Sequence, residues 1–347
     1  MSDSAQKEPI REILKAYPFQ VKGIKMISYK GKKGVWSVLT NKGNKILKKS
    51  PAQKAGRVQF ICKAVRHLRA RGIELPAVIP TRSGSDFAER QGAFYVLSEA
   101  YRGKSPEYDN SSDLAAIMKA MGKFHKASRG FSYKGESGQR EHLGKWEKSY
   151  VKHLDELRNF KSLAAKNNSP FCKLFLKHVD RFIAEGNKAL NIIRGSAYTN
   201  WVRKVNSEKN ICHQDFASGN LLKTKQSMAI IDTDSFTYDL PARDLRKILN
   251  KVMKKKGWNR AKTISMLRAY QSVHPLTSDE YKVLYADLLF PYLYYGIGSK
   301  YFKSRTGEWS SAKSLEKLKL MIRAELSKNK VLDKWTGITN AATQGKD

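Results

Sequence analysis

The chain has 347 residues, of which 41% are hydrophobic and 10% aromatic, so it is expected to fold as a globular protein, with two lobes favoured over one core. It carries 66 Lys and Arg against 31 Asp and Glu, a formal net charge of +35, and such a field attracts polyanions and acidic proteins. The N-terminus has no stretch typical of a signal peptide, the longest apolar run (288–298) is too short for a membrane span, and three cysteines at 62, 172 and 212 show no disulfide or zinc spacing.

Residues 1–100 are predicted to form a strand-rich lobe. A short helix is expected around Ile10 to Ala16. The predicted strands cover 24–29, 35–40, 45–49, 78–80 and 93–97, and a helix covers 59–71. Turns containing Gly31 and Gly34, and then Asn41 to Gly43, join the first three strands. This pattern indicates a small antiparallel sheet that carries one helix.

Residues 101–347 are predicted to form a larger, mainly helical lobe after a hinge near Tyr101. The expected helices cover 114–124, 146–160, 171–193, 242–256, 261–273, 278–303 and 312–327. A loop at 211–222 and a strand at 228–234 interrupt them. The predicted fold class is therefore α+β, with two lobes.

The loop and the strand contain the chemical motif of the chain. His213 and Asp215 form H-x-D, Asn220 follows five residues later, and Asp232 closes an apolar run. Phosphoryl transfer from a magnesium nucleotide needs one carboxylate at the attacking hydroxyl, and a carboxylate with an amide oxygen at the metal. The spacing therefore predicts a phosphotransferase site.

Six segments together give a closer match to a known family. They read KGVWSVLTNKGNKILKK at 33–49, GKFHKASRGF at 122–131, LGKW at 143–146, ICHQDFASGN at 211–220, SFTYDLPARDLRKIL at 235–249 and LLFPYLYYGIGSKYF at 288–302. With the two-lobed plan, they resemble the aminoglycoside-phosphotransferase and choline-kinase branch of the protein-kinase-like fold. Within that branch the chain resembles the CotS family of bacterial spore coat proteins.

The resemblance implies ATP and Mg²⁺ as cofactors and assigns a role to each motif residue. The implied catalytic base is Asp215, the metal ligands are Asn220 and Asp232, the phosphate-binding residues are Lys48, Gly31 and Gly34, and the adenine is met at the hinge by Glu99 and Tyr101. Asp244 would brace the loop, and Asp234 is a candidate second metal ligand.

Several of these residues also have a structural interpretation. Gly31 and Gly34 could serve only a hairpin turn, and Asp244 could be an acid favoured at a helix N-terminus. His213 is expected to orient the loop rather than to transfer a proton. His125 is expected to be a hydrogen-bonded core histidine.

Two departures from the family pattern matter for activity. Active kinases of this fold hold the strand lysine with a glutamate from the next helix, yet no acidic residue lies between Lys49 and Ile73. Gln59 is the nearest polar substitute. In the catalytic loop, Gln214, Ala217 and Ser218 replace the usual Gly, His and Pro.

Two functions follow from the motif and the resemblance. The leading hypothesis is a spore coat protein that binds Mg-ATP and phosphorylates a hydroxyl of a small molecule, a sugar or an amino sugar. The alternative is a degenerate pseudokinase that acts as a basic assembly component of the coat. The expected partners are nucleotide, a small-molecule acceptor and acidic coat proteins, without membrane or nucleic acid. The expected location is the mother-cell cytoplasm and then the spore coat.

Overall fold

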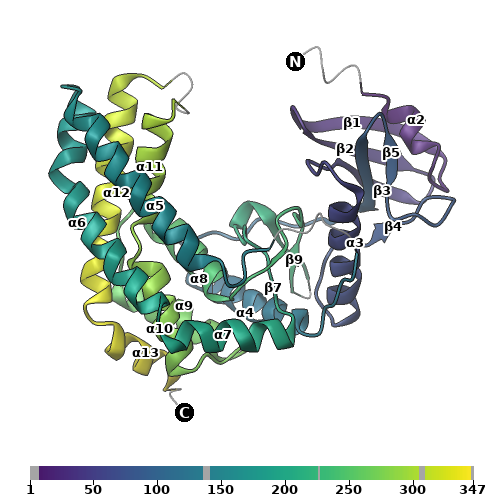
Figure 1. Cartoon of the computed structure of the whole chain (residues 1–347). Coiled ribbons are helices and arrows are strands. Elements are labelled where there is room, and N and C mark those ends of the chain that lie inside the picture. The colour runs from purple at the N-terminus through teal and green to yellow at the C-terminus, as the bar shows by residue number, and fades with distance from the viewer. Residues whose placement is uncertain (1–7, 136–140, 226, 305–308, 345–347) are drawn as a thin grey trace.

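The computed structural model describes residues 8–135, 141–225, 227–304 and 309–344. A sheet-containing lobe and a larger helical lobe lie side by side, joined around β7, β9 and α4 (Figure 1). This is the predicted two-lobed α+β arrangement.

The N-terminal lobe is built on one antiparallel sheet. Its strands are β1 (Val21–Lys30), β2 (Lys33–Thr40), β3 (Gly43–Lys49), β4 (Val78–Ile79), β5 (Ala88–Arg90) and β6 (Ala93–Glu99). The order is β1-β2-β3-β6-β4, and β5 pairs with β6. The sequence did not predict β5, whose three residues are too few to show alternation.

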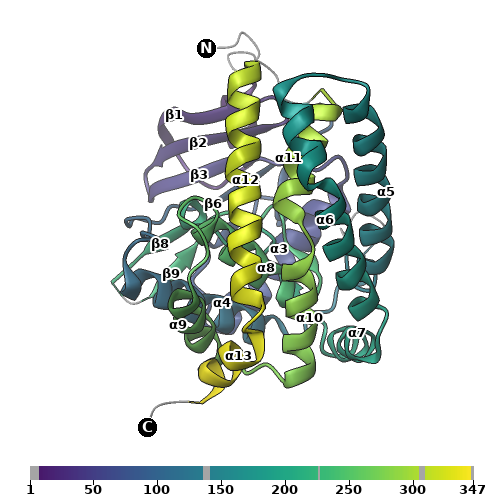
Figure 2. The same ribbon diagram turned by 90° about the vertical axis from the view of Figure 1, so that its left-hand side faces the viewer.

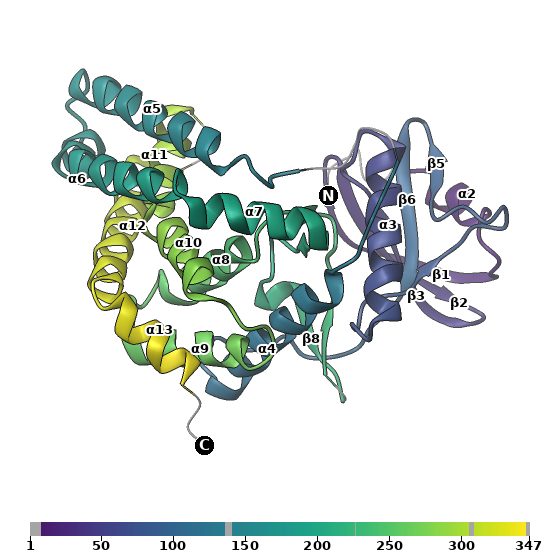
Figure 3. The ribbon, with the colours of Figure 1, turned by 60° about the horizontal axis from the view of Figure 1, so that its bottom comes forward.

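Two helices cover opposite faces of this sheet. On the outer face, α2 (Ile10–Leu14) and Tyr17 pack against Trp36 and Leu47. On the other face, α3 (Ala55–Ala70) lies between the sheet and the helical lobe (Figure 3). Gly72, with a φ of 79°, follows α3 as the sequence predicted.

The C-terminal lobe is a set of packed helices, with α12 and α11 beside α5 and α6 on the side away from the sheet (Figure 2). Its helices are α4 (Ser111–Ser128), α5 (Trp146–Ala165), α6 (Pro170–Ile193), α7 (Ser196–Glu208), α8 (Ala242–Met253), α9 (Arg260–Gln271), α10 (Ser278–Leu289), α11 (Tyr292–Phe302), α12 (Ser311–Leu332) and α13 (Trp335–Thr343). Among the described residues, no helix is both long enough and apolar enough to cross a membrane.

The prediction of one helix over 278–303 is wrong. Two helices, α10 and α11, occupy this region, and Phe290 and Pro291 separate them. Proline lacks the N–H that a helix interior needs, and it forces the preceding residue into extended backbone; Phe290 has a φ of −59° and a ψ of 128°. The sequence also missed α7 and α13.

The motif residues lie in and beside short elements that stand between helices. These elements are β7 (Ile211–Cys212), a 3₁₀ turn η1 (Ser218–Asn220), β8 (Leu221–Lys223) and β9 (Met228–Ile230), while β10 (Thr237–Tyr238) pairs with β7. His213 and Asp215 follow β7, and Asn220 lies in η1. The predicted strand at 228–234 is therefore too long. It ends at Ile230, so Asp232 stands two residues past the strand.

Candidate active site

A buried carboxylate supports the loop that contains the H-x-D motif. Asp244, in the first turn of α8, accepts hydrogen bonds from the backbone N–H groups of His213 (2.6 Å) and Gln214 (2.7 Å). His125 Nε2 lies 3.1 Å from the same side chain, and its Nδ1 lies 2.8 Å from the Tyr270 hydroxyl. Burial opposes ionisation of Asp244, but His125, His213 and Lys247 together hold the pKa of its carboxyl below the usual value. Asp244 therefore braces the loop, and His125 is a hydrogen-bonded core histidine.

His213 orients the residue that follows it in the motif. The backbone N–H of Asp215 donates to His213 Nδ1 at 3.2 Å. Burial lowers the pKa of His213, which favours the neutral ring that this bond requires. The contact is the orienting role predicted from the sequence.

Asp215 is half-buried and held by two donors. Asn220 Nδ2 donates to Asp215 Oδ2 at 2.9 Å, and Lys251 on α8 forms a hydrogen-bonded ion pair with Oδ1. Burial would raise the pKa of Asp215, but Lys251 and Asn220 lower it below the usual value. The carboxylate is therefore ionised at neutral pH and fixed in direction.

The structure brings Lys48 of the N-terminal lobe to Asp232 of the C-terminal lobe. Lys48 Nζ lies 4.0 Å from Asp232 Oδ1 and donates to the Ile231 carbonyl oxygen at 2.6 Å. The face of α3 toward Lys48 is apolar, since Val58 and Cys62 line a cavity of about 50 Å³ together with the lysine. Lys48 is thus directed by Ile231 and Asp232 rather than by a helix glutamate.

Gln59, the polar substitute suggested by the sequence, does not face Lys48. Its Oε1 accepts from the Tyr133 hydroxyl at 3.2 Å.

A second lysine contacts the carboxylates of the site. Lys33 Nζ lies 3.0 Å from Asp232 Oδ2 and 2.6 Å from Asp234 Oδ2. Burial would lower the pKa of Lys33, but Asp234 and Asp232 raise it above its usual value, so the ammonium stays charged. Because β9 ends before these residues, Asp234 does not point away from Asp232 as strand alternation would require. Both carboxylates meet the same cation.

The donors near this cation are of the kind that a hard divalent metal prefers. Asp232 offers a carboxylate, and the side-chain Oδ1 of Asn220 has no hydrogen-bond partner among the described residues, whereas its Nδ2 is bonded. Ile231 N–H donates to the Asn220 carbonyl at 2.9 Å, which ties the two segments together. These residues fit a magnesium site, although Lys33 competes for Asp232.

The two candidate phosphate-loop glycines occupy different environments. Gly31 lies in the turn between β1 and β2 with a φ of 55°, and a Cβ there would meet nothing within 4 Å. Gly34 lies in β2, where a Cβ would come within 2.2 Å of the Trp36 ring. Gly34 therefore makes room for an indole in the outer core.

The side chains of the hinge residues Glu99 and Tyr101 contact residues of the N-terminal lobe. Glu99 accepts from Lys45 at 2.7 Å, and the Tyr101 hydroxyl lies 3.4 Å from the Leu75 carbonyl oxygen. The adenine contact that the resemblance implies for these two residues would therefore use their backbone groups, and it stays a prediction.

Lys33 and Lys251 were not predicted as site residues from the sequence. Lys33 does carry a local signal, because it precedes Val35 by two residues in β2 and Val35 pairs with Lys48, so all three lie on one face of the sheet. Lys251 is one turn past Lys247 on α8, and nothing local distinguishes it from the other lysines.

Comparisons with known proteins agree with this geometry. The family described as "Spore coat putative kinase YutH" matches residues 15–335. Spore coat protein S of Bacillus subtilis (strain 168) is 35% identical over 331 residues, which cover 95% of this chain and 94% of that protein.

Two solved structures share the fold. An aminoglycoside phosphotransferase from Alicyclobacillus acidocaldarius has a TM-score of 0.79 at 17% identity, covering 95% of this chain and 96% of the other. An amicoumacin kinase in complex with AMP-PNP, Ca²⁺ and Ami has a TM-score of 0.63 at 15% identity, covering 95% of each chain. The fold is that of the aminoglycoside phosphotransferases, and the chain belongs to the YutH family of spore coat proteins, as its resemblance to CotS predicted.

Proposed function

We propose that this protein binds Mg-ATP between its lobes and transfers the γ-phosphoryl group to a hydroxyl of a small molecule. The observation that carries the proposal is the contact between Lys48 and Asp232, which are 4.0 Å apart and come from different lobes. Asn220 links this pair to Asp215 through hydrogen bonds on both sides. The amicoumacin kinase of the same fold was solved with a nucleotide analogue and a divalent cation, which supports the same use here.

In the proposed reaction, the acceptor hydroxyl oxygen forms a bond to the γ-phosphorus. The bond from that phosphorus to the β,γ-bridging oxygen breaks, ADP leaves with the electron pair, and Asp215 takes the hydroxyl proton. Lys251 and Asn220 keep Asp215 ionised and in one orientation, and Lys48 offers a positive charge to the phosphates. Asp232 and Asn220 would hold Mg²⁺, which neutralises phosphate charge when bound.

Calorimetric titration with ATP, with and without Mg²⁺, tests this proposal. We expect Mg²⁺ to strengthen ATP binding to the parent protein and to have no such effect on Asp232→Ala. Asp155→Ala, which removes an exposed carboxylate on α5, is the matched control and should behave like the parent. Equal affinity of Asp232→Ala and the parent for Mg-ATP would refute the metal assignment.

A second candidate function, a basic assembly component without catalysis, is favoured by one observation. Lys33 bridges Asp232 and Asp234, so an ammonium of the chain itself already neutralises the carboxylates that a metal would need. If the parent protein binds no ATP at any Mg²⁺ concentration, this second candidate replaces the first.

We further propose that the protein acts in the spore coat and meets acidic coat proteins through its surface charge. The proposal rests on its family and on the net charge of +35. The Debye length falls from about 10 Å at 0.1 M salt to about 3 Å at 1 M, so such association should weaken steeply with salt. Retention in isolated coats that salt does not change would point to apolar or covalent attachment.

A further inference from the structure

A basic cavity lies beside the catalytic loop. It has a volume of about 170 Å³, and the start of α5, the loop and α8 line it. Cationic side chains dominate the lining: Lys145 comes from the residue before α5, and Arg243, Arg246 and Lys247 come from α8. Asp239 is the acidic residue among the described lining residues.

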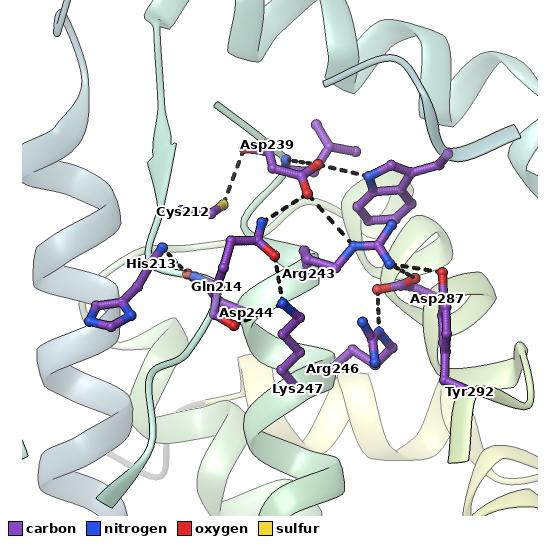
Figure 4. A network of polar contacts seen from close by, with 12 residues as sticks. Cys212, His213, Gln214, Asp239, Arg243, Asp244, Arg246, Lys247, Asp287 and Tyr292 are labelled. Carbon is purple, nitrogen blue, oxygen red and sulfur yellow. Dashed lines mark hydrogen bonds and ion pairs between the residues drawn. The ribbon is translucent and has the colours of Figure 1, made fainter. Parts of the chain in front are cut away.

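The two arginines are fixed by a carboxylate behind the cavity. Asp287 is fully buried and lies 3.3 Å from Arg243 Nη1 and 2.9 Å from Arg246 Nε (Figure 4). Aromatic rings back both guanidinium groups, Trp146 at 4.0 Å from Arg243 and Tyr292 at 4.0 Å from Arg246. Over the described chain, the terminal nitrogens of Arg246 have no hydrogen-bond partner. Oriented donors therefore remain available at the cavity.

The lining carboxylate is already occupied by the protein itself. Asp239 accepts from Trp146 Nε1 at 2.7 Å, from Gln214 Nε2 at 3.0 Å and from the Leu240 N–H at 2.9 Å. It lies 3.7 Å from Arg243 as well. Asp239 thus positions other groups and, among the described residues, forms no ion pair with Arg246 or Lys247.

Lys247 is a cation without an anionic partner. Its Nζ donates to the Gln214 carbonyl oxygen at 2.8 Å and to Gln214 Oε1 at 2.6 Å, and no carboxylate of the described residues lies within ion-pair distance. Burial, and then the charge of Arg246, lower the pKa of Lys247 to about 8. The cavity therefore carries excess positive charge that a bound anion would relieve.

We propose that this cavity binds an oxyanion, and that the acceptor of the proposed kinase is a hydroxylated compound bearing a carboxylate or phosphate group. The anion site stands on the cavity itself, while its use for an acceptor rests on the proposed function. Lys247 contacts the peptide that joins Gln214 to Asp215, so the cavity adjoins the proposed base. The sequence led us to expect a sugar or an amino sugar as acceptor. An amino sugar would bring a like charge against Arg246 and Lys247, so an acid sugar or sugar phosphate fits this cavity better.

Equilibrium binding of four related probes, without nucleotide, tests the charge preference. Glucuronate and glucose 6-phosphate carry the two oxyanions, glucose is neutral, and glucosamine is cationic. We expect one or both anionic probes to bind at least tenfold more tightly than glucose and glucosamine, and to weaken with salt. The better of the two anions identifies the oxyanion. Equal or stronger binding of glucosamine would overturn the proposal.

Single variants test the location. Lys247→Met should weaken binding of the anionic probe at least tenfold. Lys145→Met should weaken it severalfold, and because Lys145 is exposed, this substitution should not impair folding. Lys255→Met removes the same charge just beyond α8, away from the lining, and should match the parent. Unchanged affinity in both Lys247→Met and Lys145→Met would place the anion elsewhere and overturn the assignment.

A chemical readout independent of activity completes the test. Acetic anhydride labelling of Lys247, followed by mass spectrometry against pH, should show a midpoint near 8 that the anionic probe moves upward. If the anion binds here but ATP does not bind, the proposed function fails and the anion site remains. If Mg-ATP binds and the phosphoryl group goes to glucosamine, the proposed function holds and this inference is wrong.

Discussion

Lys33 Nζ lies 3.0 Å from Asp232 Oδ2, so the tip of the β1–β2 hairpin places a positive charge against the carboxylate that the motif assigns to the metal. A lysine ammonium and a divalent ion at the same carboxylate repel each other. Lys33 is therefore expected to weaken the binding of a metal at Asp232.

Lys33→Met should strengthen Mg²⁺-dependent ATP binding roughly three- to tenfold, since a half-exposed ion pair is worth about 1 kcal/mol. Calorimetry with Mg-ATP measures the change. Lys32→Met, one residue earlier in the exposed turn, removes the same charge without touching Asp232 and serves as the control. Weaker ATP binding in Lys33→Met would show that Lys33 serves the phosphates instead.

Asp215→Asn should leave ATP affinity within about twofold while lowering phosphoryl transfer by about 10²- to 10⁴-fold, because a base acts on the acceptor rather than on the nucleotide. ADP formation in a coupled assay, beside calorimetric ATP binding, separates the two effects. Undiminished turnover would place the base elsewhere.

Lys251→Met should move the acidic limb of the pH–rate profile to higher pH. Burial alone raises the pKa of Asp215, and Lys251 is the main group that lowers it, so the variant needs a higher pH to ionise its base. Lys255→Met, also near the end of α8, provides the comparison. A profile identical to that of the parent would remove Lys251 from any role in tuning Asp215.

Gly34→Ala should destabilise the protein by about 1–3 kcal/mol, because the new Cβ would lie within 2.2 Å of Trp36 in a packed core. Gly23→Ala in β1, where the nearest atom is 3.8 Å away, should be close to neutral. Urea unfolding gives the free energies. A loss of ATP affinity at unchanged stability would instead favour the phosphate-loop role for Gly34.

The lowered pKa of His274 leads us to expect that the protein loses stability in acid. Burial, followed by the charges of His125 and Arg129, lowers its pKa from 6.5 to about 3. Below pH 6.5 the unfolded chain therefore binds a proton at His274 that the native protein does not bind. The contribution of His274 to the free energy of unfolding is fully present above that pH and is lost as the pH falls below it. Between pH 7 and pH 5 the loss is about 2 kcal/mol. In His274→Leu the urea-unfolding free energy should fall by that much less over the same interval, and an unchanged slope would contradict the assignment.

Local patterns were enough to predict much of the sheet and several of the helices. Strand alternation located β2 and β3 within two residues of their ends, and the motif spacing brought Asp215, Asn220 and Asp232 into one hypothesis. The structure shows in addition that Lys48 Nζ lies 4.0 Å from Asp232 Oδ1, a contact between the two lobes that no local sequence pattern specifies.

The remaining features depend on contacts between distant segments. Lys33 is one of 66 basic residues, and only the packing of the lobes brings it to Asp232. The cavity beside the loop likewise joins Lys145 to Arg246 and Lys247, which lie about a hundred residues apart in the chain. Composition alone therefore suggested positive charge spread over the surface, whereas the structure places part of that charge in a defined cavity.

The strand order also has a consequence for synthesis on the ribosome. β6 lies between β3 and β4, and it is the last of the sheet strands to be translated. The pairing of the sheet strands can therefore be completed only after Glu99 has left the exit tunnel. At that moment α2 can cover the outer face, because Trp36 and Leu47 are already present. The opposite side of α3, with Phe60 and its neighbours, must wait for α4 and the main core. We therefore expect the nascent chain to assemble in two stages, in which α3 first packs against the sheet and afterwards packs against the helical lobe.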